Sequence, residues 1–259
     1  MKNLLVSMVL GLLLSAMVAA QTRRTDRDYD GFVGVAKTVH VEIAKLSSKS
    51  GQWVEGKSKL ERLIEYDRQG NRVKEEIYID AEDILYPSNN PCFLTPIANT
   101  FISYRYDAQG NRTDNLSIED MQGNIQPRMR KWVFVDDAKG NRVSETIYRD
   151  FACAFVPKVG HKLIGAYTHS YDEKGQRTAT TFADGGLLLY KWTYEHDESG
   201  NLSEVSKYSG NYLLVRQAYK YEFDAKGNWV KRITSKWVTK NGRSYFEPVE
   251  VTHRSIMYY

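Results

Sequence analysis

Aromatic and polar side chains alternate along much of the chain. Tyr219, Tyr221 and Phe223 are separated by Lys220 and Glu222. A period of two with one aromatic face is typical of a β-strand that is buried on one side. No segment shows sustained helical periodicity, so the pattern predicts an all-β protein. The same alternation precedes four other turns, at Trp192, Tyr194 and His196, at Tyr167, His169 and Tyr171, at Trp132 and Phe134, and at Tyr104 and Tyr106.

A short motif, Asp-x-x-Gly followed by Asn or Gln, ends each of these patterns. The Asp side chain can accept hydrogen bonds from backbone N–H groups just ahead of it, and the Gly allows the positive φ that closes a hairpin. A seventh, partial copy covers residues 120–124. We therefore predict a structural turn at each of six full copies, at Asp67 and Gly70, Asp107 and Gly110, Asp137 and Gly140, Asp172 and Gly175, Asp197 and Gly200, and Asp224 and Gly227.

Looser turn sequences fall between the motif copies, at residues 184–186, 209–211 and 241–242. Turns therefore alternate with strand-length segments, which predicts an antiparallel meander of repeated β-hairpins with about a dozen strands. Because strand twist accumulates, a sheet of this width must curl, close or split. The pattern leaves both a curled sheet and a barrel-like closure open.

The repeated motif resembles the YD (Rhs) repeat, in which Tyr-Asp is followed by x-x-Gly and a polar residue. The resemblance covers about residues 60–235 and implies an exported or surface β-repeat protein. The repeats here are few and unevenly spaced, and no Pro follows an Asp as it does in the cleavage region of the large shell-forming members. The resemblance therefore extends to the fold and not to the shell or toxin functions.

The first twenty residues have the layout of a cleaved signal peptide. Lys2 precedes an apolar run over residues 4–17, and small residues lead to Ala20. We predict cleavage between Ala20 and Gln21, which makes the protein secreted or periplasmic. No Cys stands at the cleavage point to carry a lipid. Residues 21–259 are then expected to form a single β-hairpin repeat domain.

The charge balance excludes some partners. Without Lys2 the chain has 35 Lys and Arg against 32 Asp and Glu, evenly interspersed. A nucleic-acid-binding protein would gather positive charge on one face, so no nucleic-acid partner is expected. No run of 18 apolar residues follows residue 20, which predicts no membrane span in the mature chain.

Residues 51–58 match the P-loop pattern Gly-x-x-x-x-Gly-Lys-Ser, after a strand-like stretch. A P-loop requires a helix that starts at its Lys, here Lys57. However, Gly51-Gln52-Trp53-Val54 parallels Gly227-Asn228-Trp229-Val230, where Gly227 belongs to a motif turn. We interpret the match as a hairpin and expect no nucleotide or other cofactor.

No residue set predicts a catalytic or metal centre. The five His residues lack the spacings that metal sites commonly use, and the Asp-rich turns lack the calcium-loop pattern. No nucleophile, Cys-pair or zinc-protease motif occurs. Packing explains the His residues, and backbone capping explains the Asp residues.

Arg72, Arg112, Arg142 and Arg177 follow the last residue of the motif in four copies. Such a row could meet anionic glycans, but an Asp five residues before each Arg favours local neutralisation. The aromatic columns could likewise stack on sugars, although their alternation with polar residues favours a core role.

The two Cys residues, Cys92 and Cys153, are predicted to form a disulfide, because unpaired exposed thiols are uncommon in exported proteins. Both fall in long interruptions of the repeat, residues 79–100 and 149–162, which we expect to be loops rather than strands. Two buried free thiols are the alternative.

Taken together, these patterns favour a non-enzymatic protein that serves in surface interaction, with a glycan, cell-wall or other cell-surface component as its partner. A glycan-active secreted enzyme, with carboxylates scattered among the repeats, is the alternative. A convergence of acidic or aromatic side chains in one cleft would distinguish an enzyme from a binding protein.

Overall fold

The computed structural model describes residues 24–78, 97–108, 110–120, 125–153 and 156–259. Within these residues, fifteen strands follow one short helix, α2 (Asp26–Tyr29). The strands are β1 (Ala36–Lys49), β2 (Gln52–Glu55), β3 (Lys59–Tyr66), β4 (Arg72–Tyr78), β5 (Ile97–Tyr106), β6 (Arg112–Asp120), β7 (Ile125–Asp136), β8 (Arg142–Cys153), β9 (Val156–Tyr171), β10 (Arg177–Asp184), β11 (Leu187–His196), β12 (Leu202–Ser209), β13 (Tyr212–Phe223), β14 (Trp229–Lys240) and β15 (Arg243–Tyr258).

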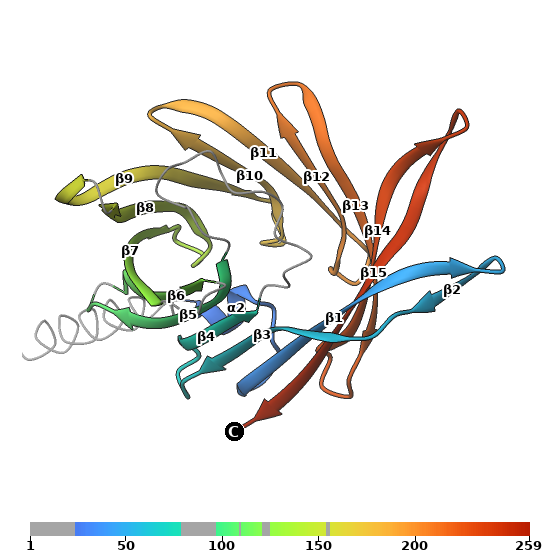
Figure 1. Ribbon diagram of the computed structural model, residues 1–259, viewed down its shortest axis with the longest axis horizontal. Coiled ribbons are helices and arrows are strands. Elements are labelled where there is room, and N and C mark those ends of the chain that lie inside the picture. Colours follow the sequence, from blue (N-terminus) through green and yellow to red (C-terminus); the bar gives the residue numbers. More distant parts are fainter. Residues whose placement is uncertain (1–23, 79–96, 109, 121–124, 154–155) are drawn as a thin grey trace, which may run out of the picture.

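The strands form one antiparallel meander that closes into a barrel (Figure 1). From β3 to β15 each strand pairs with the next, and β1 pairs with both β3 and β15. Fourteen strands make the closed wall, because β2 pairs only with the outer part of β1. The predicted all-β meander is confirmed, and the choice that the sequence left open is resolved as a barrel.

The barrel closes where its first strand, β1, pairs with its last strand, β15. Val39 of β1 lies opposite Ile256 of β15 and opposite Ile64 of β3. These residues belong to a small apolar core in which Val39 and Ala36 are fully buried. Closing the sheet removes both free edges, which are otherwise a site for aggregation.

The motif turns and the looser turns lie at opposite ends of the barrel. The motif turns join β3 to β4, β5 to β6, β7 to β8, β9 to β10, β11 to β12 and β13 to β14. The looser turns join β10 to β11, β12 to β13 and β14 to β15 at the other end. We call these the motif end and the finger end.

Two details of the sequence interpretation are settled by the strand order. Gly51 lies in the turn between β1 and β2, and β3 begins at Lys59, so no helix starts at Lys57. The expectation of a loop at residues 149–162 is wrong, since β8 continues to Cys153 and β9 starts at Val156. Cys153 lies opposite Val156 in this pair of strands, and backbone pairing does not require an alternating pattern of side chains.

Residues 24–35, which we call the plug, lie inside the barrel at its motif end. They contact β3, β5, β8, the β13–β14 turn and β15, which surround them, and Figure 1 shows α2 within the ring of strands. An eight-stranded barrel is filled by its own side chains, so a barrel of this size has room for such a segment. Within the described residues, no helix is long and apolar enough to cross a membrane.

Candidate functional site

The six motif turns share one hydrogen-bonding pattern. In the first, the Asn71 amide donates to Oδ1 of Asp67 at 2.9 Å, and the Gly70 amide donates to the Asp67 carbonyl at 3.1 Å. Gly70 has a φ of 93°, which a β-branched residue could adopt only at a cost of about 1–2 kcal/mol. The same backbone pattern occurs at Asp107, Asp137, Asp172, Asp197 and Asp224, and every motif Gly has a positive φ.

Arg72, Arg112 and Arg142 pair with carboxylates other than the Asp of their own motif. This corrects the expectation that the motif Asp neutralises them. Both carboxylate oxygens of Asp67 accept bonds from Asn71, so they hold the turn together. Arg72 instead contacts Asp30 of the plug at 2.7 Å and Glu75 at 3.0 Å. Asp30 lies in another element, 42 residues before Arg72, so spacing from the motif could not indicate it, and Glu75 lies three residues farther along β4.

Two carboxylates of the plug hold it in the barrel. Asp30 accepts a 2.5 Å bond from the Tyr66 hydroxyl in addition to its contact with Arg72. Asp26 accepts bonds from the Tyr106 hydroxyl and from the Arg72 amide. A capping box between Thr25 and Asp28 fixes the short helix that carries them.

The far end of the plug is held by another motif turn. Oδ1 of Asn228 accepts a 2.7 Å bond from the Val33 amide, and its Nδ2 donates to the Val33 carbonyl at 3.0 Å. Asn228 is almost fully buried, and its side chain also bonds the Tyr258 hydroxyl. In this copy the motif Asn therefore binds the plug as well as completing its own turn.

Arg142 enters the same region from the start of β8. Its guanidinium carbon lies 3.6 Å from the ring centre of Phe134 and 4.3 Å from that of Tyr29 in the plug. Arg142 is 5% exposed, its Nε atom has no hydrogen-bond partner, and its contacts with Asp136 and Glu145 are long, at 3.6 and 3.9 Å. The guanidinium group therefore packs against two aromatic rings, and its N–H donors are not all used by the protein.

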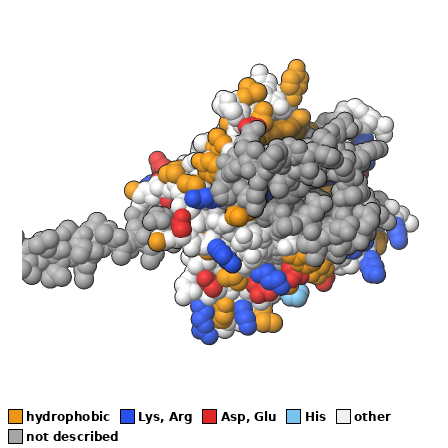
Figure 2. Space-filling view, turned by 60° about the vertical axis from the view of Figure 1, so that its left-hand side comes forward, with side chains coloured by type: hydrophobic (Ala, Val, Ile, Leu, Met, Phe, Trp, Pro, Cys, Tyr) orange, Lys and Arg blue, Asp and Glu red, His pale blue; other side chains and the backbone are white. Residues whose placement is uncertain are grey.

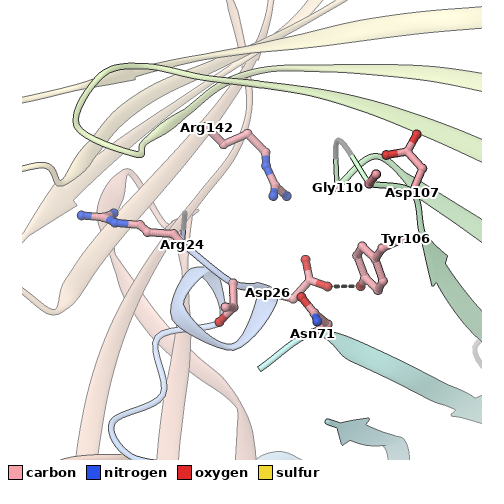
Figure 3. A pocket seen from close by; sticks show the side chains of 9 residues that line it. Arg24, Asp26, Asn71, Tyr106, Asp107, Gly110 and Arg142 are labelled. Carbon is pink, nitrogen blue, oxygen red and sulfur yellow. Dashed lines mark hydrogen bonds between the residues drawn. The ribbon is translucent and has the colours of Figure 1, made fainter. Parts of the chain in front are cut away.

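The guanidinium of Arg142 projects into a pocket between the plug and the turns (Figure 3). The pocket has a volume of about 270 Å³, and Arg24 lies at its margin. Its acidic members already have structural roles, since Asp26 binds Tyr106 and Asp107 holds its own turn through Asn111. The pocket lining comprises Arg24, Thr25, Asp26, Asn71, Tyr106, Asp107, Ala108, Gly110 and Arg142.

Burial shifts the pKa values of groups around the pocket. Desolvation raises the pKa of Tyr29 to about 12, although Arg142 opposes the shift. Burial alone would raise the pKa of Glu145, but contacts with His169 and Arg142 outweigh it and lower that pKa. His169 is buried and bonds Thr180 at 3.0 Å, so it has a packing role on the inner wall.

Sequence reasoning missed the plug, whose one local signal was the capping box Thr25-x-x-Asp28. Residues 1–20, the cleavage residues Ala20 and Gln21, and Cys92 lie outside the described residues, as does the side chain of Cys153. Among the side chains that the structure describes, no group of three or more His, Cys, Asp or Glu is placed to hold a metal ion.

Comparison with known proteins assigns no family. No family model matches the chain, and no curated protein does. Among solved structures, a porin-like protein from Bacteroides uniformis ATCC 8492 is similar, with 10% identity and a TM-score of 0.46 over 87% of this chain and 99% of that one. A porin-like protein from Bacteroides vulgatus ATCC 8482 has 9% identity and a TM-score of 0.40 over 88% and 99%.

Proposed function

We propose that this protein acts outside the cytoplasm as a non-enzymatic β-barrel binding protein, and that its plugged motif end binds an acidic glycan. The observation that carries the proposal is Arg142, a buried cation between Phe134 and Tyr29 that projects into a pocket. Guanidinium groups suit the bidentate binding of carboxylates and phosphates.

A negatively charged ligand group fits the pocket better than a cation does. Asp26 and Asp107 have hydrogen-bond donors from the protein, whereas the contacts of Arg142 with carboxylates are long, 3.6 Å from Nε to Asp136 and 3.9 Å from Nη1 to Glu145. A bound carboxylate would accept hydrogen bonds from the guanidinium group that projects into the pocket (Figure 3). Because both carboxylates hold structure, the pocket offers no ready general acid or base, which favours binding over glycan hydrolysis.

The outer wall supports an aqueous location. Tyr221 contacts Trp229, and Trp229 lies against Arg254 beside the plug, so Tyr221 faces inward. Its neighbours Lys220 and Glu222 therefore face outward, and both are exposed. A barrel embedded in lipid carries an apolar band on its outside. We accordingly propose a secreted or periplasmic barrel, related to the YD repeats through its turns.

Binding of acidic oligosaccharides to the mature protein tests this function. We expect calorimetric binding of uronic-acid oligosaccharides or cell-wall fragments, and weak or no binding of neutral sugars of the same length. Arg142→Gln should weaken binding by about tenfold or more, which corresponds to one lost charged contact. Arg24→Gln should weaken binding by a smaller factor, because the guanidinium of Arg24 points away from the pocket in Figure 3 and acts on the ligand at longer range.

Arg177→Gln is the matched control, since Arg177 also follows a motif turn but does not line the pocket. Arg24 is only half-buried, so its variant keeps the test valid if Arg142→Gln fails to fold. Equal affinity of all three variants, or no binding of any acidic glycan, would overturn the proposal.

A further inference from the structure

At the finger end, two-stranded ribbons extend beyond the closed wall of the barrel. β13 pairs with β14 only from Gln217 onward, so residues 212–216 have β12 as their one neighbour. The tip of β14–β15 likewise extends beyond the pairing of Gln217 with Lys236. Figure 1 shows the β10–β11, β12–β13, β14–β15 and β1–β2 ribbons spreading apart. We call them the fingers.

Apolar side chains are exposed on both faces of these fingers. Leu187 and Leu188 are consecutive in β11 and are 67% and 54% exposed. Residues 212–215 are four consecutive apolar residues, all exposed, and Tyr212 reaches 80%. Consecutive strand residues point to opposite faces, so neither face of these ribbons is covered. Figure 2 shows hydrophobic side chains at the top of the molecule, the level of the β12–β13 tip in Figure 1.

Such runs are costly in water unless something covers them. Exposed runs of three or four apolar residues are uncommon outside binding surfaces, and an isolated two-stranded ribbon is marginally stable. The other two fingers also expose aromatic rings, Trp53 on β2 and Trp237 and Tyr245 on β14 and β15. Trp and Tyr are enriched where protein meets the interface of a lipid bilayer.

The charge of the fingers indicates which surface they meet. We count each finger together with the strand residues at its base, which we call its root. The four segments contain ten Lys and Arg against three Asp and Glu, over residues 45–60, 183–191, 207–216 and 236–247. The rest of the chain has 26 against 29. Eight of the ten basic residues in the fingers and roots are lysines. Apolar tips with basic roots match an anionic membrane surface.

We propose that the four fingers dock this protein on the surface of an anionic phospholipid bilayer. A flat protein partner would cover one face of each ribbon, whereas fluid lipid surrounds both faces. The docking is shallow, because the outer edges of the ribbons carry unpaired backbone groups that cannot enter the hydrocarbon core. The proposal is independent of the glycan pocket, which lies at the motif end.

Sedimentation with vesicles tests the docking. Mature protein should sediment with vesicles of phosphatidylglycerol and phosphatidylcholine, less with phosphatidylcholine alone, and less again in high salt. The variant L187S/L188S/L213S/L214S should lose at least about tenfold in vesicle affinity because it removes apolar contact from two fingers.

Val135→Ser/Met257→Ser is the matched control, since these side chains are 52% and 58% exposed near the motif end. It should bind vesicles as the parent protein does, and circular dichroism should establish that both variants are folded. No sedimentation of the parent protein, or equal binding by the finger variant, would overturn the proposal. The proposal would also be overturned if the parent protein formed a stable dimer, the finger variant did not, and neither protein bound vesicles.

Discussion

A β-carbon added to Gly70 would lie 2.6 Å from Oγ1 of Thr25, because the plug rests directly on the first motif turn. Gly70 therefore meets two requirements at once. Its φ of 93° favours glycine, and its missing side chain leaves space for the start of α2. The Arg27 amide also donates to the Gly70 carbonyl at 3.0 Å.

This arrangement predicts that Gly70→Ala is more harmful than the same change in another motif turn. Gly227→Ala is the control, since Gly227 has a φ of 85° and open space where a β-carbon would lie. We expect Gly227→Ala to lower the free energy of unfolding by about 1–2 kcal/mol, and Gly70→Ala by about 1–3 kcal/mol more. Urea unfolding measures both, and equal losses would contradict the packing of Thr25 on Gly70.

Asn228 should matter more than the Asn of an exposed copy. Asn228→Ala removes two bonds to Val33 and leaves backbone groups of the plug without partners, at a cost of about 2–3 kcal/mol. Asn201→Ala serves as control, because Asn201 bonds only within its own turn to Asp197. Hydrogen exchange of the Val33 amide should speed up in the first variant and stay unchanged in the second.

The raised pKa of Tyr29 predicts a loss of stability in alkali. Its pKa of about 12 in the folded protein exceeds the ordinary value of 10, so the unfolded chain releases this proton first. Its contribution is present below pH 10 and is lost as the pH rises from 10 to 12. Tyr29→Phe should therefore show a shallower fall in unfolding free energy over that range. Urea unfolding at several pH values gives the slope, and identical slopes would refute the assignment.

The disulfide between Cys92 and Cys153 stays a prediction. It would close a loop of about 60 residues and stabilise the fold by roughly 4 kcal/mol through chain entropy. Intact mass under non-reducing conditions, after treatment of unfolded protein with an alkylating agent, should show no added mass. Alkylation of both cysteines without reduction would rule the bond out.

Export predicts the first residue of the mature protein. N-terminal sequencing of protein from the extracytoplasmic fraction should begin at Gln21, since small residues precede that position as signal peptidase requires. A chain that starts at Met1 and is recovered with membranes would contradict this. The result also decides whether the plug, which starts three residues later, is close to a free N-terminus.

The sequence alone determined the hairpins and the antiparallel meander, because both depend on interactions between residues that are close in sequence. A motif such as Asp67-x-x-Gly70-Asn71 makes its own hydrogen bonds within five residues, so it predicts a hairpin wherever it occurs. Alternation along β13 similarly depends only on neighbouring residues. These two signals were sufficient for an antiparallel meander. They could not indicate closure, because closure depends on β1 meeting β15 across the whole domain.

Only the tertiary structure decided where the charged residues act. Arg72 has a motif Asp five residues away, yet it pairs with Asp30, 42 residues distant in sequence, because the turn uses the nearer carboxylate. Arg142 gains its pocket only when the plug brings Tyr29 against it. The exposed fingers likewise follow from where the pairing of neighbouring strands stops. Such features depend on contacts between distant segments, which no local pattern encodes.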